Sequence, residues 1–262
     1  MCLAFGLSFL SAAQAPAWAL DPIPATNPKS SRDMFSLGFA AYKRGETAEA
    51  LDALQQAATL GHAGARWKLG QMYAEGDGVK ENDFEAFKMF EEILQDQDDD
   101  TASSPNAAYI ASAVVALAGY FRSGIPGTPV ASDPSQARQL YSHAASYFGD
   151  PEAQFELGRM LLAGEGGRPN PRQAARWLQL AAKKGHAKAQ ALLGYLLFDG
   201  ETISLRAEPA RGLAMLTEAF RTAAPKDREW IRPLQEEAFS LSTEDDRRTA
   251  LAYADEKVKS PR

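Results

Sequence analysis

Residues 149–164, GDPEAQFELGRMLLAG, and residues 185–200, GHAKAQALLGYLLFDG, share one pattern. A glycine is followed four residues later by alanine, then by Leu-Gly, and the segment closes on another glycine. Residues 61–76, GHAGARWKLGQMYAEG, are a third copy, and the last two copies begin 36 residues apart. A fixed period of this length is typical of stacked helical repeats, which more often hold other molecules than transform them.

Each position of the pattern has a mechanical reason. An alanine-rich segment precedes the first glycine, as at 144–147, and a glycine such as Gly149 then closes that helix. The Leu-Gly step places a small residue, such as Gly158, where a second helix has to approach closely. The last glycine, Gly164 in this copy, ends the helix. The pattern therefore predicts an antiparallel pair of helices in each repeat.

The spacing also predicts a repeat that the pattern hides. Gly61 and Gly149 are 88 residues apart, which is two periods of 36 plus 16. A repeat with alanine in the small-residue position fits between them, at Ala113, Leu117, Ala118 and Gly124. The extra length is then assigned to insertion loops near 95–106 and 125–134. A shorter helix pair is expected around residues 37–51.

These motifs resemble the Sel1-like repeats, a branch of the tetratricopeptide superfamily. The resemblance rests on the Leu-Gly steps, on Ala-Ala-x-x-Gly-His at 57–62 and 181–186, and on Gly-Asp-Gly-Val at 76–79. It implies an all-α, right-handed α-solenoid of about five helix-turn-helix repeats over residues 33–224. The repeat pattern is absent from residues 225–262, and their two charged helical segments predict a terminal helical cap.

The first nineteen residues are apolar and end in Ala17-Trp18-Ala19, which predicts a signal peptide over 1–19 and export to the periplasm. Residues 20–32 are expected to form a flexible leader. Because no Lys or Arg precedes the apolar segment, an N-terminal helix that joins the fold stays open as an alternative. No later segment reaches about 18 consecutive apolar residues, so the mature chain is not expected to insert into a membrane.

Composition and motifs argue against several classes of function. The net charge is −6 and no basic stripe is present, so nucleic acid is not an expected partner. His62 and His186 occupy the same repeat position, far apart along the array, which argues against a shared metal site. The acidic run at 96–100 lacks the ligand spacing of a calcium loop. We therefore predict no catalytic residue, no cofactor and no metal.

One surface of the array is predicted to bind another protein. The first helix of each pair is expected to line the concave face, and residues beside the packed Ala and Leu-Gly positions are expected to point outward. Long polar groups with an aromatic ring among them suit the recognition of a polypeptide. The predicted protein-binding residues are Arg66, Gln71, Gln154, Arg159, Gln190 and Tyr195.

The layout as a whole also resembles a family of periplasmic negative regulators of exopolysaccharide synthesis in alphaproteobacteria. The resemblance rests on Asp33-Met34-Phe35 before the first repeat, on the insertion at 95–105, and on an array without cysteine, since Cys2 is the only one. It implies that the protein represses a membrane sensor kinase of a two-component system by binding its periplasmic domain. Two other classes stay open, an envelope assembly or secretion scaffold and an enzyme with an unrecognised site. The sequence leaves the oligomeric state open.

Overall fold

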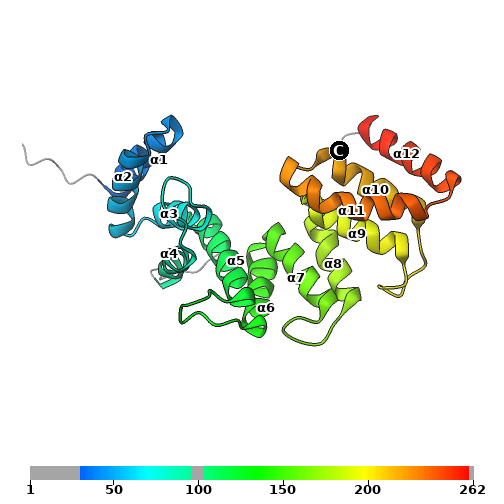
Figure 1. Ribbon diagram of the computed structural model, residues 1–262, viewed down its shortest axis with the longest axis horizontal. Helices are drawn as coiled ribbons and strands as arrows, with labels where there is room; N and C mark the ends of the chain where they lie inside the picture. The colour runs from blue at the N-terminus through cyan, green and yellow to red at the C-terminus, as the bar shows by residue number, and fades with distance from the viewer. Residues whose placement is uncertain (1–29, 96–102, 260–262) are drawn as a thin grey trace, which may run out of the picture.

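The computed structural model describes residues 30–95 and 103–259, with side chains up to residue 253. Within these ranges the chain forms twelve α-helices and one π-helix, with no strand. The helices follow one another along an arch, with α1 and α2 at one end and α11 and α12 at the other (Figure 1). The predicted signal peptide, most of the predicted leader and residues 96–102 of the first insertion lie outside the described residues. The last two leader residues, Ser31 and Arg32, already belong to α1.

Ten of the helices form five antiparallel pairs, and the all-α solenoid predicted from the repeats is confirmed. The pairs are α1 (Ser31–Arg44) with α2 (Thr47–Thr59), α3 (Ala63–Glu75) with α4 (Asp83–Gln95), α5 (Ala107–Ser123) with α6 (Pro134–His143), α7 (Pro151–Ala163) with α8 (Pro171–Lys183), and α9 (Ala187–Asp199) with α10 (Pro209–Thr222). We call the contact between successive pairs a junction, so the first junction joins the first pair to the second and the fourth joins the fourth pair to the fifth.

The repeat glycines end helices, as predicted. Gly149 and Gly185 have φ of 66° and 85°, and the closing Gly76 and Gly164 have φ of 66° and 72°. These are left-handed conformations that other residues rarely adopt. His186 begins the next helix, where its Nδ1 accepts a hydrogen bond from the amide of Ala189 at 3.1 Å, and His62 does the same for α3. The two histidines are therefore one capping position used twice.

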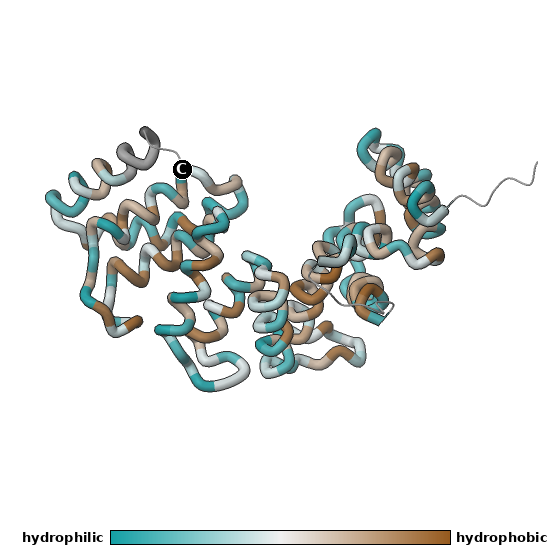
Figure 2. The backbone as a smooth tube through the Cα atoms, turned by 180° about the vertical axis from the view of Figure 1, so that it is seen from behind, coloured by the Kyte–Doolittle hydropathy of each residue, from teal (hydrophilic) through white to brown (hydrophobic). Residues whose placement is uncertain are grey.

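A small residue lies at the crossing of the two helices in every pair. A Cβ atom on Gly158 would lie 2.9 Å from Cγ of Leu178 on α8, and one on Gly194 would lie 2.9 Å from the carbonyl oxygen of Gly212 on α10. Ala118 fills this position in the hidden repeat and is fully buried. Apolar and polar residues alternate along most helices, as expected where one face is buried (Figure 2).

The third pair departs from the regular geometry on both sides of α6. Ile125 and Val130, in the connection between α5 and α6, are buried in the core and bonded to each other through their backbones at 2.9 Å. After α6 the chain forms a π-helix, η1 (Ala144–Phe148), which ends at Gly149. A π-helix accommodates about one extra residue within a helical turn, so η1 takes up a single residue, and the rest of the additional length lies in the connections.

Two helices close the C-terminal end of the array. α11 (Pro225–Leu241) packs on α9 and α10, and α12 (Glu244–Lys259) packs on α10. Thr243 caps α12, because its Oγ1 accepts from the amide of Asp246 at 3.2 Å. Among the described helices, none is both long enough and apolar enough to span a membrane.

Candidate functional site

The outward orientation predicted for Arg66 and Gln154 is wrong. Arg66 is 8% exposed and Gln154 is 3% exposed. Nη1 of Arg66 donates to the carbonyl oxygen of Glu92 on α4 at 3.2 Å, and Nε2 of Gln154 donates to that of Ala145 at 3.1 Å. Both residues lie four positions before the small residue of their repeat, so a helix of 3.6 residues per turn places them on the face that packs against neighbouring helices.

The other four predicted binding residues are half-buried. Gln190 occupies the same repeat position as Arg66, and its Nε2 lies 3.5 Å from the carbonyl oxygen of Met215 on α10. Gln71, Arg159 and Tyr195 directly follow the small residue and lie on a different face of their helices. Burial, and then a hydrogen bond to Glu237 of α11, raises the pKa of Tyr195. The cap therefore covers part of the surface that the repeats alone would expose.

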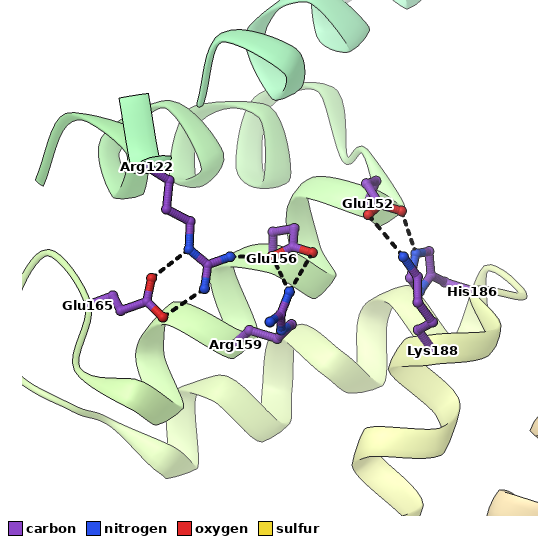
Figure 3. Close-up of polar contacts among 7 residues, drawn as sticks. All are labelled: Arg122, Glu152, Glu156, Arg159, Glu165, His186 and Lys188. Atoms are coloured by element: carbon purple, nitrogen blue, oxygen red, sulfur yellow. Dashed lines mark hydrogen bonds and ion pairs between the residues drawn. The ribbon is translucent and has the colours of Figure 1, made fainter. Parts of the chain in front are cut away.

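A network of four charged side chains joins the third and fourth pairs (Figure 3). Nε and Nη2 of Arg122, at the end of α5, donate to both carboxylate oxygens of Glu165, at 2.5 and 2.7 Å. Its Nη1 donates to Glu156 at 2.7 Å, and Nη1 of Arg159 donates to the same carboxylate at 3.0 Å. Such bidentate, charge-assisted contacts fix geometry more firmly than single ion pairs.

Charge inside this network shifts the pKa values of its members. The hydrogen bonds from Arg122 lower the pKa of Glu165, and the bond to Glu165 raises that of Arg122. The Tyr141 hydroxyl has its pKa raised by burial first and then by the nearby Glu156. Glu156 is only 12% exposed, so this carboxylate depends on its two arginine partners for the stabilisation that water would otherwise provide.

At the first junction, a polar contact uses the same repeat positions as the contact between Arg122 and Glu165. The hydroxyl of Tyr42 on α1 donates to Asp77 at 2.5 Å, and Nζ of Lys68 lies 3.5 Å from Asp77 and 3.6 Å from the centre of the Tyr42 ring. Tyr42 and Arg122 both lie four residues after the small residue of their repeat. Asp77 and Glu165 both directly follow a closing glycine, and we call this position the turn acid.

A second polar group lies at the start of α7 (Figure 3). Glu152 accepts from Nε2 of His186 at 2.8 Å and lies 3.6 Å from Nζ of Lys188. Burial acts to raise the pKa of Glu152, but His186 and Lys188 together lower it below its ordinary value. The His186 ring lies 4.8 Å from that of Phe155, so the capping histidine also ties the fourth pair to the fifth.

An open groove lies beside these contacts, at the fourth junction. Its volume is 370 Å³, and it is lined by Arg122, Arg159, Leu162, Ala163, Glu165, Leu192 and Trp230. Trp230 comes from α11 and packs edge-on against Phe155 at 5.6 Å. The groove thus combines an apolar wall with the charged network. Within the part of the chain that the structure describes, no cluster of three or more His, Cys, Asp or Glu side chains is placed to hold a metal.

Of the predicted binding residues, only Arg159 lines this groove. Trp230 and Leu192 were missed by sequence reasoning, since Trp230 lies outside the repeats and Leu192 is one of many leucines in α9. Glu165 was assigned only to a turn. The recurrence of an acid after the closing glycine, at Asp77, Glu165 and Glu201, was the sequence signal that pointed to it.

The repeats match a known family of repeat proteins. Residues 63–93, 111–146, 151–186 and 187–220 each match the Sel1 repeat, and the match at 111–146 is the hidden repeat. The chain belongs to the Sel1 repeat family, and it is a regulatory repeat protein. Two curated relatives are similar to it over most of their length. Both are called "Exopolysaccharide production negative regulator". The relative from Rhizobium meliloti (strain 1021) is 50% identical over 254 residues, covering 96% of this chain and 91% of its own. The relative from Rhizobium leguminosarum bv. viciae is 45% identical over 256 residues, covering 97% and 92%.

Solved structures support the same fold. The crystal structure of a Sel1 repeat protein from Oxalobacter formigenes has a TM-score of 0.58 and 25% identity, over 72% of this chain and 70% of that one. A protective antigen of uropathogenic Escherichia coli that displays an SLR fold has a TM-score of 0.68 and 22% identity. The match covers 88% of this chain but about half, 46%, of the antigen.

Proposed function

We propose that this protein is a periplasmic, non-catalytic repressor of exopolysaccharide synthesis. It binds the periplasmic domain of a membrane sensor kinase and stabilises the inactive conformation of that kinase. A ligand shifts such an equilibrium only by its difference in affinity for the two states, so the repressor must bind the inactive form more tightly. The signal peptide predicted over residues 1–19 delivers the chain to the compartment where this domain is exposed.

The observation that carries the proposal is the extent of similarity to the two rhizobial regulators. Identity of 45–50% extends over more than nine-tenths of each chain, so the relatives share the array and both of its ends. The groove at the fourth junction, with an apolar wall and a charged rim, is a suitable surface for another polypeptide. Repeat arrays of this type present extended surfaces for binding.

The test combines genetics with direct binding. Deletion of the gene should raise the phospho-relay output of the kinase and the amount of exopolysaccharide, and the purified periplasmic domain should bind the mature chain. The mature N-terminus, measured by mass spectrometry, should begin at Leu20. A deletion that leaves both outputs unchanged contradicts the proposal. Copurification of envelope assembly or secretion components without the kinase would instead favour a scaffold.

A further inference from the structure

At the fourth junction the polar contacts of Glu152 with His186 and Lys188 lie at the start of α7, whereas the repeat positions that meet the turn acid at the first and third junctions are apolar here. Leu162 occupies the position that Arg122 and Tyr42 hold in their repeats, and Leu192 occupies the position of Glu156 and Lys68. Both leucines line the groove. Apolar side chains therefore stay partly open to solvent where the other two junctions close through ion pairs and hydrogen bonds.

Arg159 forms the charged side of this groove. It is 37% exposed, and only its Nη1 bonds within the described residues, to both oxygens of Glu156 at 3.0 and 3.1 Å. Arg122, in contrast, uses Nε, Nη1 and Nη2 on Glu156 and Glu165. The Nε and Nη2 edge of Arg159 thus retains a pair of donors whose spacing matches a carboxylate.

We propose that the groove binds an acidic–apolar segment of the partner protein. One Asp or Glu carboxylate of that segment accepts from Nε and Nη2 of Arg159, and an adjacent apolar side chain packs against Leu162, Leu192 and Trp230. This inference rests on the proposed function for the nature of the partner, and it adds where the partner binds and which side chains it presents.

Charge and shape favour this occupant over others. The carboxylates of Glu156 and Glu165 stand beside the groove, so a phosphate carrying two charges is repelled more than a single carboxylate. An open, elongated groove with an apolar wall suits a segment of polypeptide, since aromatic and arginine side chains at the centre of a contact contribute most of its affinity. Trp230 and Arg159 are such side chains.

The first experiment measures the affinity of the full mature chain for the purified periplasmic domain of the sensor kinase. Arg159→Gln and Leu192→Gln should each raise Kd by about tenfold or more, because one removes a charge-assisted pair and the other removes the apolar contact. Arg211→Gln is the matched control. Arg211 forms the same type of ion pair three residues along a helix, with Glu208, but it lies outside the groove. Circular dichroism checks that the variants fold.

The second experiment identifies the occupant. The photo-crosslinking residue p-benzoyl-phenylalanine replaces Leu192, and in the control it replaces Leu180, which is 43% exposed on α8. Crosslinking in the envelope should attach, from position 192 only, a partner segment that contains Asp or Glu beside an apolar residue. Combining this replacement with Arg159→Gln should abolish the product.

The outcomes separate the two proposals. If the domain binds and neither groove substitution changes Kd by more than about twofold, the groove inference is overturned while the repressor proposal stands. A captured segment without an acidic residue, a segment from a second copy of this chain, or the absence of any crosslink from position 192 also overturns it. If the domain does not bind the wild-type chain, the repressor proposal fails. In that case an acidic–apolar segment captured through Arg159 still supports the groove.

Discussion

The first and third junctions join neighbouring repeats through the same repeat positions but with different chemistry. At the first, Asp77 is the one carboxylate among the described residues that pairs with Lys68, whose side chain is 8% exposed. At the third, Glu165 shares Arg122 with a second acid, Glu156. The contact at the first junction therefore depends on a single residue, whereas the third contains a network that retains a partner when one member is lost. Repeats with equivalent backbones thus differ in how much the turn acid contributes to the stability of the fold.

At the fourth junction the residue at the position opposite the turn acid, in the preceding repeat, is apolar. Its turn acid, Glu201, follows Gly200 as the others follow their glycines, but Leu162 stands where Tyr42 or Arg122 would meet it. Glu201 is exposed, and Leu162 and Leu192 line the groove at this junction. The contact between the turn acid and the preceding repeat, present at the first and third junctions, is thus replaced at the fourth by an open apolar surface. We infer that some junctions serve stability and that the fourth serves binding.

Neutralising Asp77 should have the largest effect. Asp77→Asn leaves the buried ammonium of Lys68 without a carboxylate, and we expect the free energy of unfolding to fall by about 2 kcal/mol. Urea denaturation followed by circular dichroism measures it. Lys68→Met in the same background should recover part of the loss, because it removes the unpaired charge. Equal stability of wild type and Asp77→Asn would show that the first junction does not depend on this acid.

Neutralising Glu165 should cost less, although it removes two short hydrogen bonds. In Glu165→Gln, Arg122 keeps Glu156 as a partner, and the Arg122 side chain is 20% exposed whereas that of Lys68 is 8% exposed, so solvent stabilises the remaining cation better at the third junction. We expect a loss of about 1 kcal/mol in the same urea experiment. A loss larger than that of Asp77→Asn would reverse the ranking of the two junctions.

Acid should reduce the difference between wild type and Glu165→Gln. Arg122 lowers the pKa of Glu165 below its ordinary value of 4.5, so the folded state favours the ionised form. The resulting stabilisation is complete above about pH 4.5 and is lost as the pH falls through the lower, folded-state pKa. Melting temperatures measured from pH 7 to pH 3 should therefore converge for the two proteins. A difference that stays constant with pH would mean that the glutamine acts through shape rather than through charge.

Neutralising Glu201 should have the smallest effect. Since no arginine or tyrosine occupies the position opposite, Glu201→Gln should leave the melting temperature unchanged within error. Leu162→Arg in the wild-type background is the complementary variant, because it places a cation where Arg122 stands in its own repeat. Binding of the kinase domain should weaken in Leu162→Arg even if the fold is unaffected. A clear loss of stability in Glu201→Gln would mean that Glu201 makes a stabilising polar contact at the fourth junction.

The sequence alone determined the architecture. The positions of glycine, alanine and Leu-Gly fixed where helices end and where they cross, since few residues tolerate a left-handed conformation or a close helix crossing. Even the hidden repeat at 111–146 followed from the arithmetic of the period. The caps at His62, His186 and Thr243 are equally local features, because a cap bonds to residues three positions away.

The tertiary structure alone decided which side chains form the candidate site. Arg66 and Gln154 are polar residues on the buried face, where long side chains reach carbonyl groups of neighbouring helices, and composition does not distinguish such a position from an exposed one. Trp230 reaches the groove only because α11 folds back onto α9, and Arg122 meets Glu165 across 43 residues of sequence. The repeat period predicts which face of a helix packs against its partner in the same pair. The groove depends instead on how separate repeats and the C-terminal cap pack together, and the cap does not follow the repeat period.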